Sequence, residues 1–246
     1  MDRWGRRGGA LGIAVVLAVG VLSGSSARAS EPAAPASCPE VAMIAARGSG
    51  QADGAGAQLD GTFAALRSAL PGVTVELLPV PYPALGAENA LLNPAAFTAS
   101  IDQGVQAMRR QARELADACP STDLVLAGFS QGAMVTHAAL RDAATARRTH
   151  AALLMADGFR TRVDRVAYLP IGPVRSRGVV VANARAAAPG PLRMPAKAVG
   201  TCLAGDVVCD WSADADLATG LRLHSTGYLD PRVQQAAAAA IAARLG

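Results

Sequence analysis

A serine stands between two glycines in the pentapeptide Gly128-Phe129-Ser130-Gln131-Gly132. The apolar run before the pentapeptide predicts a strand, and the small residues after it predict a helix. A sharp turn from strand to helix needs glycine two residues before and two residues after the serine, because neighbouring backbone comes close there. The serine then stands at a helix N-terminus, where developing negative charge is favoured. The pattern therefore favours a nucleophilic serine over a glycine-rich turn with a capping serine.

A serine nucleophile needs a base, and the sequence offers three histidines. His137 lies seven residues further along the same predicted helix, about 10 Å along its axis, and cannot reach Ser130. His150 begins the next predicted strand, at the end opposite the carboxyl edge where sites of parallel sheets form. His224, in the stretch LRLHSTGY, remains. We expect it to lie in a loop-like segment before the last helix and to act as the base.

The base in turn needs an acid to orient it. The chain order Ser, Asp or Glu, His places this acid between residues 130 and 224. Asp206 follows a predicted strand and lies between Cys202 and Cys209. Asp157 is the alternative candidate for the acid, because it too lies at the end of a predicted strand. We favour Asp206 because a disulfide around its loop would fix the carboxylate; Asp210, Asp214 and Asp216 are expected to cap or solvate a helix.

Acyl transfer also needs hydrogen-bond donors for the oxyanion of the tetrahedral intermediate. The backbone N–H of Gln131, next to the serine, supplies one by its position. A second is expected from a loop after an early strand, and Arg47-Gly48-Ser49-Gly50 follows such a strand. Ser49 offers a hydroxyl and an N–H, although the stretch alone also fits a flexible loop.

The elements that must position these residues alternate along the chain. Short apolar runs of the kind buried on both faces of a sheet predict strands at 41–46, 73–80, 123–128, 150–157, 177–184 and 196–202. Amphipathic or alanine-rich patterns predict helices at 57–70, 94–119, 132–144 and 231–245. The alternation predicts an α/β fold, a three-layer sandwich with a central, mostly parallel sheet. Residues 158–195, rich in Arg, Pro and Gly, are read either as a substrate-facing excursion or as a solvated connection.

The N-terminus reads as a signal peptide over residues 1–29. Arginines precede an apolar run from about Ala10 to Leu22, and Ala27-Arg28-Ala29 offers small residues for cleavage before Ser30. The alternative, a membrane anchor, is disfavoured because Gly20 interrupts a run already shorter than the roughly 20 residues of a bilayer span. Cleavage lowers the net charge from +4 to about +1. A nucleic-acid partner is not expected, because basic residues interleaved with aromatics are missing from the sequence.

Four cysteines in an exported chain favour two disulfides, with three possible connectivities. Cys202 and Cys209 are close in sequence and are expected to pair, which leaves Cys38 with Cys119. A metal site is not expected, because the cysteines lack the Cys-x2-Cys spacing of zinc ligands. The predicted organisation is a signal peptide, a Pro/Ala-rich lead at 30–37, and a single domain at 38–246.

Three groups of residues resemble the cutinase family of secreted serine esterases, a compact lidless branch of the α/β-hydrolase fold. They are Ala46-Arg47-Gly48-Ser49, Gly128-Phe129-Ser130-Gln131-Gly132-Ala133, and Cys202-x-x-Gly205-Asp206-x-x-Cys209 followed by His224. The resemblance implies Ser130 as nucleophile, His224 as base, Asp206 as acid, and Ser49 with the Gln131 amide as oxyanion hole. It also implies the disulfides Cys38–Cys119 and Cys202–Cys209 and no cofactor. The long segment 158–195 is more similar to cutinase-like proteins of high-GC bacteria.

The sequence thus predicts a secreted, monomeric esterase for carboxylic esters with short to medium acyl chains, in a lipid, a cutin-like polyester or an acylated polysaccharide. The protein is expected to be released or held at the cell envelope. Alternatives of the same fold are an acetylxylan or other carbohydrate esterase and a phospholipase or acyltransferase for envelope lipids. A different class, an exported surface protein that kept the fold and lost activity, is the non-enzymatic alternative.

Overall fold

The structure is a computed structural model, and it describes residues 37–161, 165–169, 177–182 and 192–245. The expected signal peptide at 1–29 and nearly all of the lead at 30–37 lie outside these residues, as does much of the segment 158–195. The single domain predicted at 38–246 stays a prediction.

Six strands form one sheet in the order β2-β1-β3-β4-β6-β5, and every neighbouring pair is parallel. The strands are β1 (Val41–Ala46), β2 (Val75–Pro79), β3 (Asp123–Phe129), β4 (Ala151–Met155), β5 (Ala167–Tyr168) and β6 (Ala198–Thr201). β1, β3, β4 and β6 are buried along nearly their whole length, as continuous apolar runs in a parallel sheet should be.

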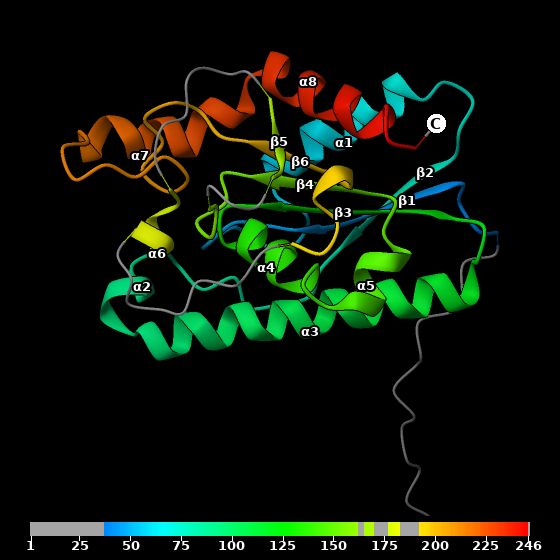
Figure 1. Ribbon diagram of the computed structural model, residues 1–246, viewed down its shortest axis with the longest axis horizontal. Coiled ribbons are helices and arrows are strands. Elements are labelled where there is room, and N and C mark those ends of the chain that lie inside the picture. Colours follow the sequence, from blue (N-terminus) through cyan, green and yellow to red (C-terminus); the bar gives the residue numbers. More distant parts are fainter. Residues whose placement is uncertain (1–36, 162–164, 170–176, 183–191, 246) are drawn as a thin grey trace, which may run out of the picture. The chain divides into compact units, whose positions relative to one another are not determined.

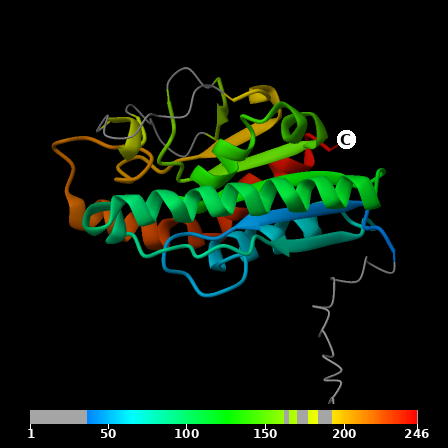
Figure 2. The same cartoon turned by 90° about the horizontal axis from the view of Figure 1, so that it is seen from below.

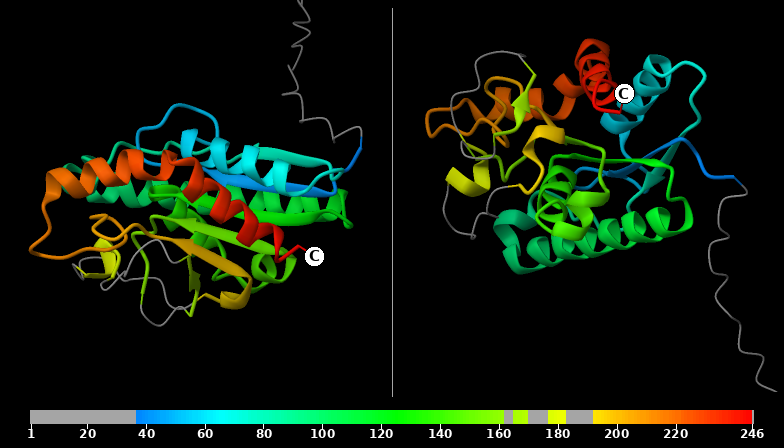
Figure 3. Two further views of the ribbon diagram at one scale, coloured as in Figure 1. Left: turned by 90° about the horizontal axis from the view of Figure 1, so that it is seen from above. Right: turned by 45° about the vertical axis from the view of Figure 1, so that its right-hand side comes forward.

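Helices cover both faces of the sheet (Figure 1). α1 (Ala57–Ala69) and α8 (Pro231–Ala242) lie side by side over one face, as Figure 3 shows from above. The long α3 (Pro94–Ala118) crosses the other face together with α4 (Gln131–Ala139) and α5 (Ala143–Arg148); Figure 2 shows α3 from below. The predicted three-layer α/β fold is confirmed.

Each face of the sheet has its own apolar core. Met43, Val125 and Leu153 point toward α1 and α8, where they meet Leu59 and Ile241. The alternate strand positions, among them Ile44 and Leu126, point to the opposite face and pack on Met108 of α3 and Val135 of α4. Burying side chains of this size contributes about 1.5 to 3 kcal/mol each.

Shorter elements lie between these. They are α2 (Asn89–Leu92), α6 (Val179–Ala182), α7 (Leu217–Thr226) and the 3₁₀ turns η1 (Pro195–Lys197) and η2 (Gly227–Leu229). α2, α6 and α7 gather at one end of the sheet in Figure 1.

Three of the sequence predictions about elements are wrong: the strand at 177–184, the single helix at 132–144 and the loop-like segment around His224. The run at 177–184 is not a strand: Val179–Ala182 form the short helix α6, Arg177 makes a single bridge to Trp211, and 183–184 lie outside the described residues. The helix expected at 132–144 breaks after Ala139, and α5 starts afresh with Asp142 as its N-cap. The carboxylate of Asp142 accepts from the N–H of Thr145, which caps α5 and separates it from α4.

Candidate active site

Ser130 occupies the turn between β3 and α4, with φ 56° and ψ −118°. This strained conformation is held by close packing of both glycines. A Cβ on Gly128 would lie 2.0 Å from the carbonyl oxygen of Gly132, and one on Gly132 would lie 1.9 Å from that of Ala46. The N–H of Ser130 also donates to Met155 O at 2.9 Å. The expected reason for glycine at these two positions therefore holds in the structure.

A chain of hydrogen bonds joins Ser130 to His224 and Asp206. The Nε2 of His224 lies 2.9 Å from Ser130 Oγ, and its Nδ1 lies 3.0 Å from each oxygen of Asp206. A carboxylate only accepts, so Nδ1 carries the hydrogen, and the Nε2 of the neutral ring then accepts the hydroxyl hydrogen of Ser130. The geometry is that of a nucleophile, a base and an orienting acid.

The carboxylate of Asp206 is fully buried and further hydrogen-bonded. It accepts from the N–H of Val208 at 2.7 Å and from the hydroxyl of Tyr228 at 2.6 Å. Burial, and then the charge of Asp206, raise the pKa of Tyr228 well above its usual value, so the phenol stays protonated and donates. Tyr228 carried no signal in the sequence, because its contact with Asp206 is made only by the fold.

A disulfide closes the loop around Asp206. Cys202, at the end of β6, is bonded to Cys209, and Cys38 is bonded to Cys119; the described residues include no free cysteine. The bond between Cys202 and Cys209 therefore holds the Asp206 loop at the carboxyl end of β6.

His224 lies in a helix, which corrects the expected loop. It belongs to the last turn of α7, which begins after its N-cap Asp216. The sequence did not indicate a helix here because the leucines of α7 do not form a buried apolar face: Leu217 and Leu221 are each 54% exposed. His224 itself is held by Phe129, whose ring stacks on the imidazole with centroids 5.1 Å apart.

The two remaining histidines have other partners. His137 is fully buried in α4, and its Nδ1 lies 2.6 Å from the carboxylate of Asp157, the rival acid in the sequence. His150 lies at the start of β4, and its Nδ1 accepts from the N–H of Leu124. The structure thus brings Ser130 together with His224 and Asp206 and leaves Asp157 paired elsewhere.

The candidate oxyanion donors approach from two elements. Gln131 is the first residue of α4, so its backbone N–H has no partner within the helix. Ser49 lies in the loop after β1, and its neighbours are anchored: Gly48 N–H donates to Gln51 Oε1, and Gly50 N–H donates to Ala84 O. These contacts fix the loop on both sides of Ser49.

Arg47 secures the root of the same loop. Its buried guanidinium donates to the carbonyls of Gln51 and Tyr82 and pairs with Asp53. The phenol of Tyr82 in turn donates to the carbonyl of Arg47. The loop is therefore tied to the chain that follows β2, although it has no regular secondary structure.

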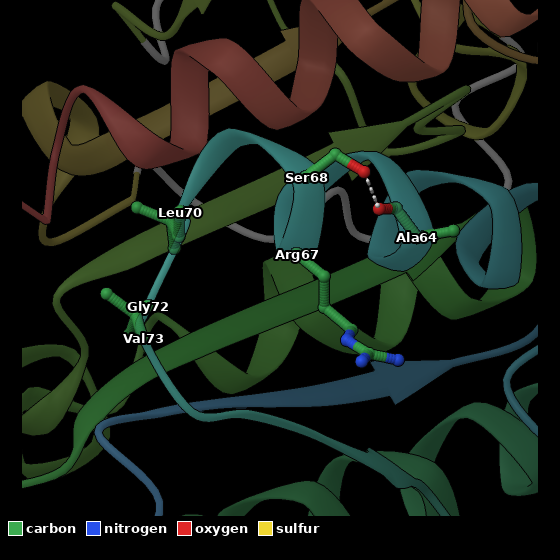
Figure 4. A pocket seen from close by; sticks show the side chains of 6 residues that line it. All are labelled: Ala64, Arg67, Ser68, Leu70, Gly72 and Val73. Carbon is green, nitrogen blue, oxygen red and sulfur yellow. Dashed lines mark hydrogen bonds between the residues drawn. The ribbon is translucent and has the colours of Figure 1, made fainter.

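A pocket elsewhere takes no part in this arrangement. It is a hollow of about 400 Å³ lined by Ala64, Arg67, Ser68, Leu70, Gly72 and Val73 (Figure 4). These residues lead from the end of α1 to the start of β2. The pocket therefore lies at the amino ends of the strands, whereas Ser130 lies at their carboxyl ends.

The described residues form neither a membrane-spanning helix nor a metal-binding cluster. None of their helices is long and apolar enough to cross a membrane. Nor do three or more His, Cys, Asp or Glu side chains in that part of the chain gather in a way that could hold a metal ion.

The profile of the Cutinase family matches residues 37–244. The chain belongs to the cutinase family. Among curated relatives of this cutinase-family chain, Cutinase cut1 of Trichoderma harzianum is 34% identical over 128 residues, which are 51% of this chain and 48% of the relative. A cutinase of Kineococcus radiotolerans is 40% identical over 106 residues, 43% of this chain and 32% of the relative. The chain thus spans about half the length, or less, of these relatives.

Solved structures share the fold. The catalytic core domain of acetyl xylan esterase from Trichoderma reesei has a TM-score of 0.66 at 23% identity, covering 85% of this chain and all of that one. Trichoderma reesei cutinase in complex with a C11Y4 phosphonate inhibitor has a TM-score of 0.56 at 25% identity, covering 85% of this chain and 78% of the other. Both likenesses agree with the layered fold described above.

Proposed function

We propose that this chain is an exported serine esterase that hydrolyses carboxylic esters through an acyl-enzyme. The observation that carries the proposal is the hydrogen-bonded chain from Ser130 Oγ through His224 to Asp206 at the turn after β3. Membership of the cutinase family supports it, as do the two disulfides, which are typical of extracellular proteins.

The first half-reaction acylates the serine. His224 Nε2 takes the proton of Ser130 Oγ as this oxygen attacks the ester carbon, and the carbonyl oxygen becomes an oxyanion. The N–H of Gln131 and the donors of Ser49 stabilise the oxyanion. The alcohol then leaves with the proton that His224 returns, and the acyl group stays on Ser130.

The second half-reaction releases the acid. His224 takes a proton from water, the hydroxide attacks the acyl carbon, and a second oxyanion forms in the same place. Its collapse returns the proton to Ser130 Oγ. Asp206 stays ionised throughout and stabilises the imidazolium that forms twice per cycle.

Exposed leucines near the site favour an apolar acyl group. Leu91 and Leu92 of α2 are 85% and 81% exposed, and Leu217 and Leu221 of α7 are each 54% exposed. The chain before α2 touches the Ser49 loop through the Gly50 N–H bond to Ala84, and α7 carries His224. Two apolar helices therefore flank the site, a placement that suits esters of lipids or polyesters with medium to long acyl chains.

A second candidate function is an acetyl esterase for acylated polysaccharide. It is favoured by one curated relative, Acetylxylan esterase 2 of Talaromyces purpureogenus, which is 34% identical over 104 residues. A binding protein without activity is the non-enzymatic alternative.

The test is turnover of p-nitrophenyl esters from acetyl to palmitoyl, with and without an organophosphate. Hydrolysis that the organophosphate abolishes, with its adduct on Ser130, is the expected result, and the Ser130→Ala variant should fold and lose nearly all turnover. A sharp preference for acetyl would favour the second candidate. No turnover and no adduct from the folded, disulfide-bonded protein would overturn the esterase.

A further inference from the structure

A relay of side-chain amides joins the loop after β1 to helix α7. The Oε1 of Gln51 accepts from the N–H of Gly48 at 2.6 Å. The Nε2 of Gln51 donates to Gln58 Oε1 at 2.7 Å, and the Nε2 of Gln58 donates to the carbonyl of Ser225 at 3.1 Å. Three hydrogen bonds therefore link segments that are far apart in sequence.

The direction of every bond in the relay is fixed by its ends. The N–H of Gly48 can only donate and the carbonyl of Ser225 can only accept, so both glutamine amides are held in one orientation. Gln58 is only 5% exposed, in the first turn of α1. The glycine at 56 leaves the space for Gln51, because a Cβ there would lie 2.3 Å from Gln51 Oε1.

The two ends of the relay stand next to candidate catalytic groups. Gly48 precedes Ser49, and Ser225 follows His224. The relay therefore spans from the candidate oxyanion loop to the candidate base, and His224 is hydrogen-bonded to Ser130.

α7 depends on such links, because little of it is buried. Gly220 is its one buried residue, and all ten residues of α7 are described. The last carbonyls of a helix lack partners within it, and Gln58 satisfies that of Ser225. An apolar contact links the same two segments. The ring of Phe129 stacks on His224 and also packs closely on Gly48, because a Cβ on Gly48 would lie 2.8 Å from Phe129 Cδ1.

We propose that Gln51 and Gln58 are positioning residues, which hold the Ser49 loop and the His224 helix at a fixed separation around Ser130. This inference rests on the proposed esterase. Both groups act on the tetrahedral intermediate, the oxyanion donors on one side and the imidazolium on the other. Loss of the relay should therefore slow the chemical steps and leave ground-state binding of the ester almost unchanged.

The experiment compares Gln51→Met, Gln58→Met and the double variant with wild type on one p-nitrophenyl ester. Methionine keeps the length of the side chain and removes the hydrogen bonds. We expect kcat to fall about tenfold in each single variant, with KM within about twofold. The double variant should be no slower than the singles, because one break already opens the relay.

Gln111→Met is the matched control. Gln111, in α3, also donates its side-chain amide to one backbone carbonyl, that of Pro79, and lies on the opposite face of the sheet from α1. This variant should keep the kcat of wild type. If a methionine variant fails to fold, as judged by circular dichroism, Gln58→Glu serves in its place: it keeps the acceptor for Gln51 and loses the donor for Ser225, so kcat should fall equally.

The outcomes separate this inference from the proposed function. A wild-type protein without turnover and without an organophosphate adduct overturns both. An active wild type whose variants keep kcat within twofold, or change KM alone, overturns the relay only. If the fold-losses of kcat in the two single variants multiply in the double variant, the relay is also overturned, because such losses would indicate two independent packing defects.

Discussion

The imidazole of His224 lies almost parallel to the ring of Phe129, with 20° between the planes and 5.1 Å between the centroids. Phe129 immediately precedes Ser130, so one strand end carries both the candidate nucleophile and the surface on which its base rests. The ring of Tyr228 contacts both of these rings, tilted at 58° to Phe129 and at 75° to His224. The candidate base His224 is thus oriented by an aromatic contact as well as by Asp206.

The pairs His224–Asp206 and His137–Asp157 should respond differently to loss of the histidine. His224→Ala should lower kcat by at least about a thousandfold with little change in melting temperature, because the ring is partly exposed and acts on Ser130. His137→Ala should instead destabilise the fold by about 3 kcal/mol, since the fully buried carboxylate of Asp157 loses the imidazole and keeps only the N–H of Phe159 among the bonds described for it, while the folded fraction keeps turnover. Urea midpoints and kcat measured on both variants decide; a folded His137→Ala protein without activity would contradict the assignment.

Gln131→Met should spare activity. The side chain of Gln131 is fully buried, and neither its amide oxygen nor its nitrogen has a hydrogen-bond partner in the described part of the chain. Removing two unpaired buried polar atoms should be neutral or stabilising by about 1 kcal/mol. The proposed oxyanion donor is the backbone N–H, which methionine keeps. A hundredfold loss of kcat in the folded variant would mean that the side chain itself takes part.

Leu91→Ser with Leu92→Ser should change chain-length preference. If the acyl chain covers these exposed leucines, kcat/KM on the palmitoyl ester should fall about tenfold, while the acetyl ester is turned over as before. The acetyl ester is the internal control, because its acyl group has no alkyl chain that could cover the leucines. Equal loss on both esters would argue for damage to the Ser49 loop and against an acyl-binding role.

The stability of α7 should depend on pH through Asp216. The hydroxyl of Thr219 and then its N–H lower the pKa of this N-cap carboxylate below its usual value. A lowered folded-state pKa gives stability that is present above the unfolded value, about 3.9, and is lost as pH falls through the folded value. Asp216→Ala should therefore melt below wild type at pH 7, and the gap should narrow as the pH falls below the unfolded value and through the lowered folded one.

Asp214→Ala is the control for this comparison, because Asp214 is also exposed and does not cap the helix. A gap between Asp216→Ala and wild type that stays constant down to pH 2 would contradict the capping account. The difference is read from thermal unfolding followed by circular dichroism.

The strands that carry the site could be predicted because each is a buried apolar run bounded by turn residues. β1 has the predicted bounds, and β3 exceeds them by one residue. The run at 177–184 failed for a tertiary reason. Its valines have strand propensity, but Gly178 packs on the carbonyl of Gly158 and Val179 N–H donates to Val208 O, which holds the run as a helical turn beside the Asp206 loop.

The candidate nucleophile, base and acid were accessible from the sequence because chain order and strand ends restrict them. The residues that orient them were not. Tyr228 reaches Asp206 across 22 residues, and Gln58 reaches Ser225 across 167. Neither glutamine nor tyrosine has a spacing that marks such a role, so only the packing of α1 and η2 reveals it.

The all-parallel sheet has a consequence for how the chain reaches its native state. No two neighbouring strands are joined by a hairpin, so every pairing requires closure of a long crossover before its contacts form. Such non-local topologies fold slowly, because loop-closure entropy is lost before native contacts compensate for it. The bond between Cys38 and Cys119 encloses β1, α1, β2, α2 and α3. Oxidation of this pair therefore shortens the conformational search that brings β1 beside β3, and refolding from the reduced chain should be the slower route.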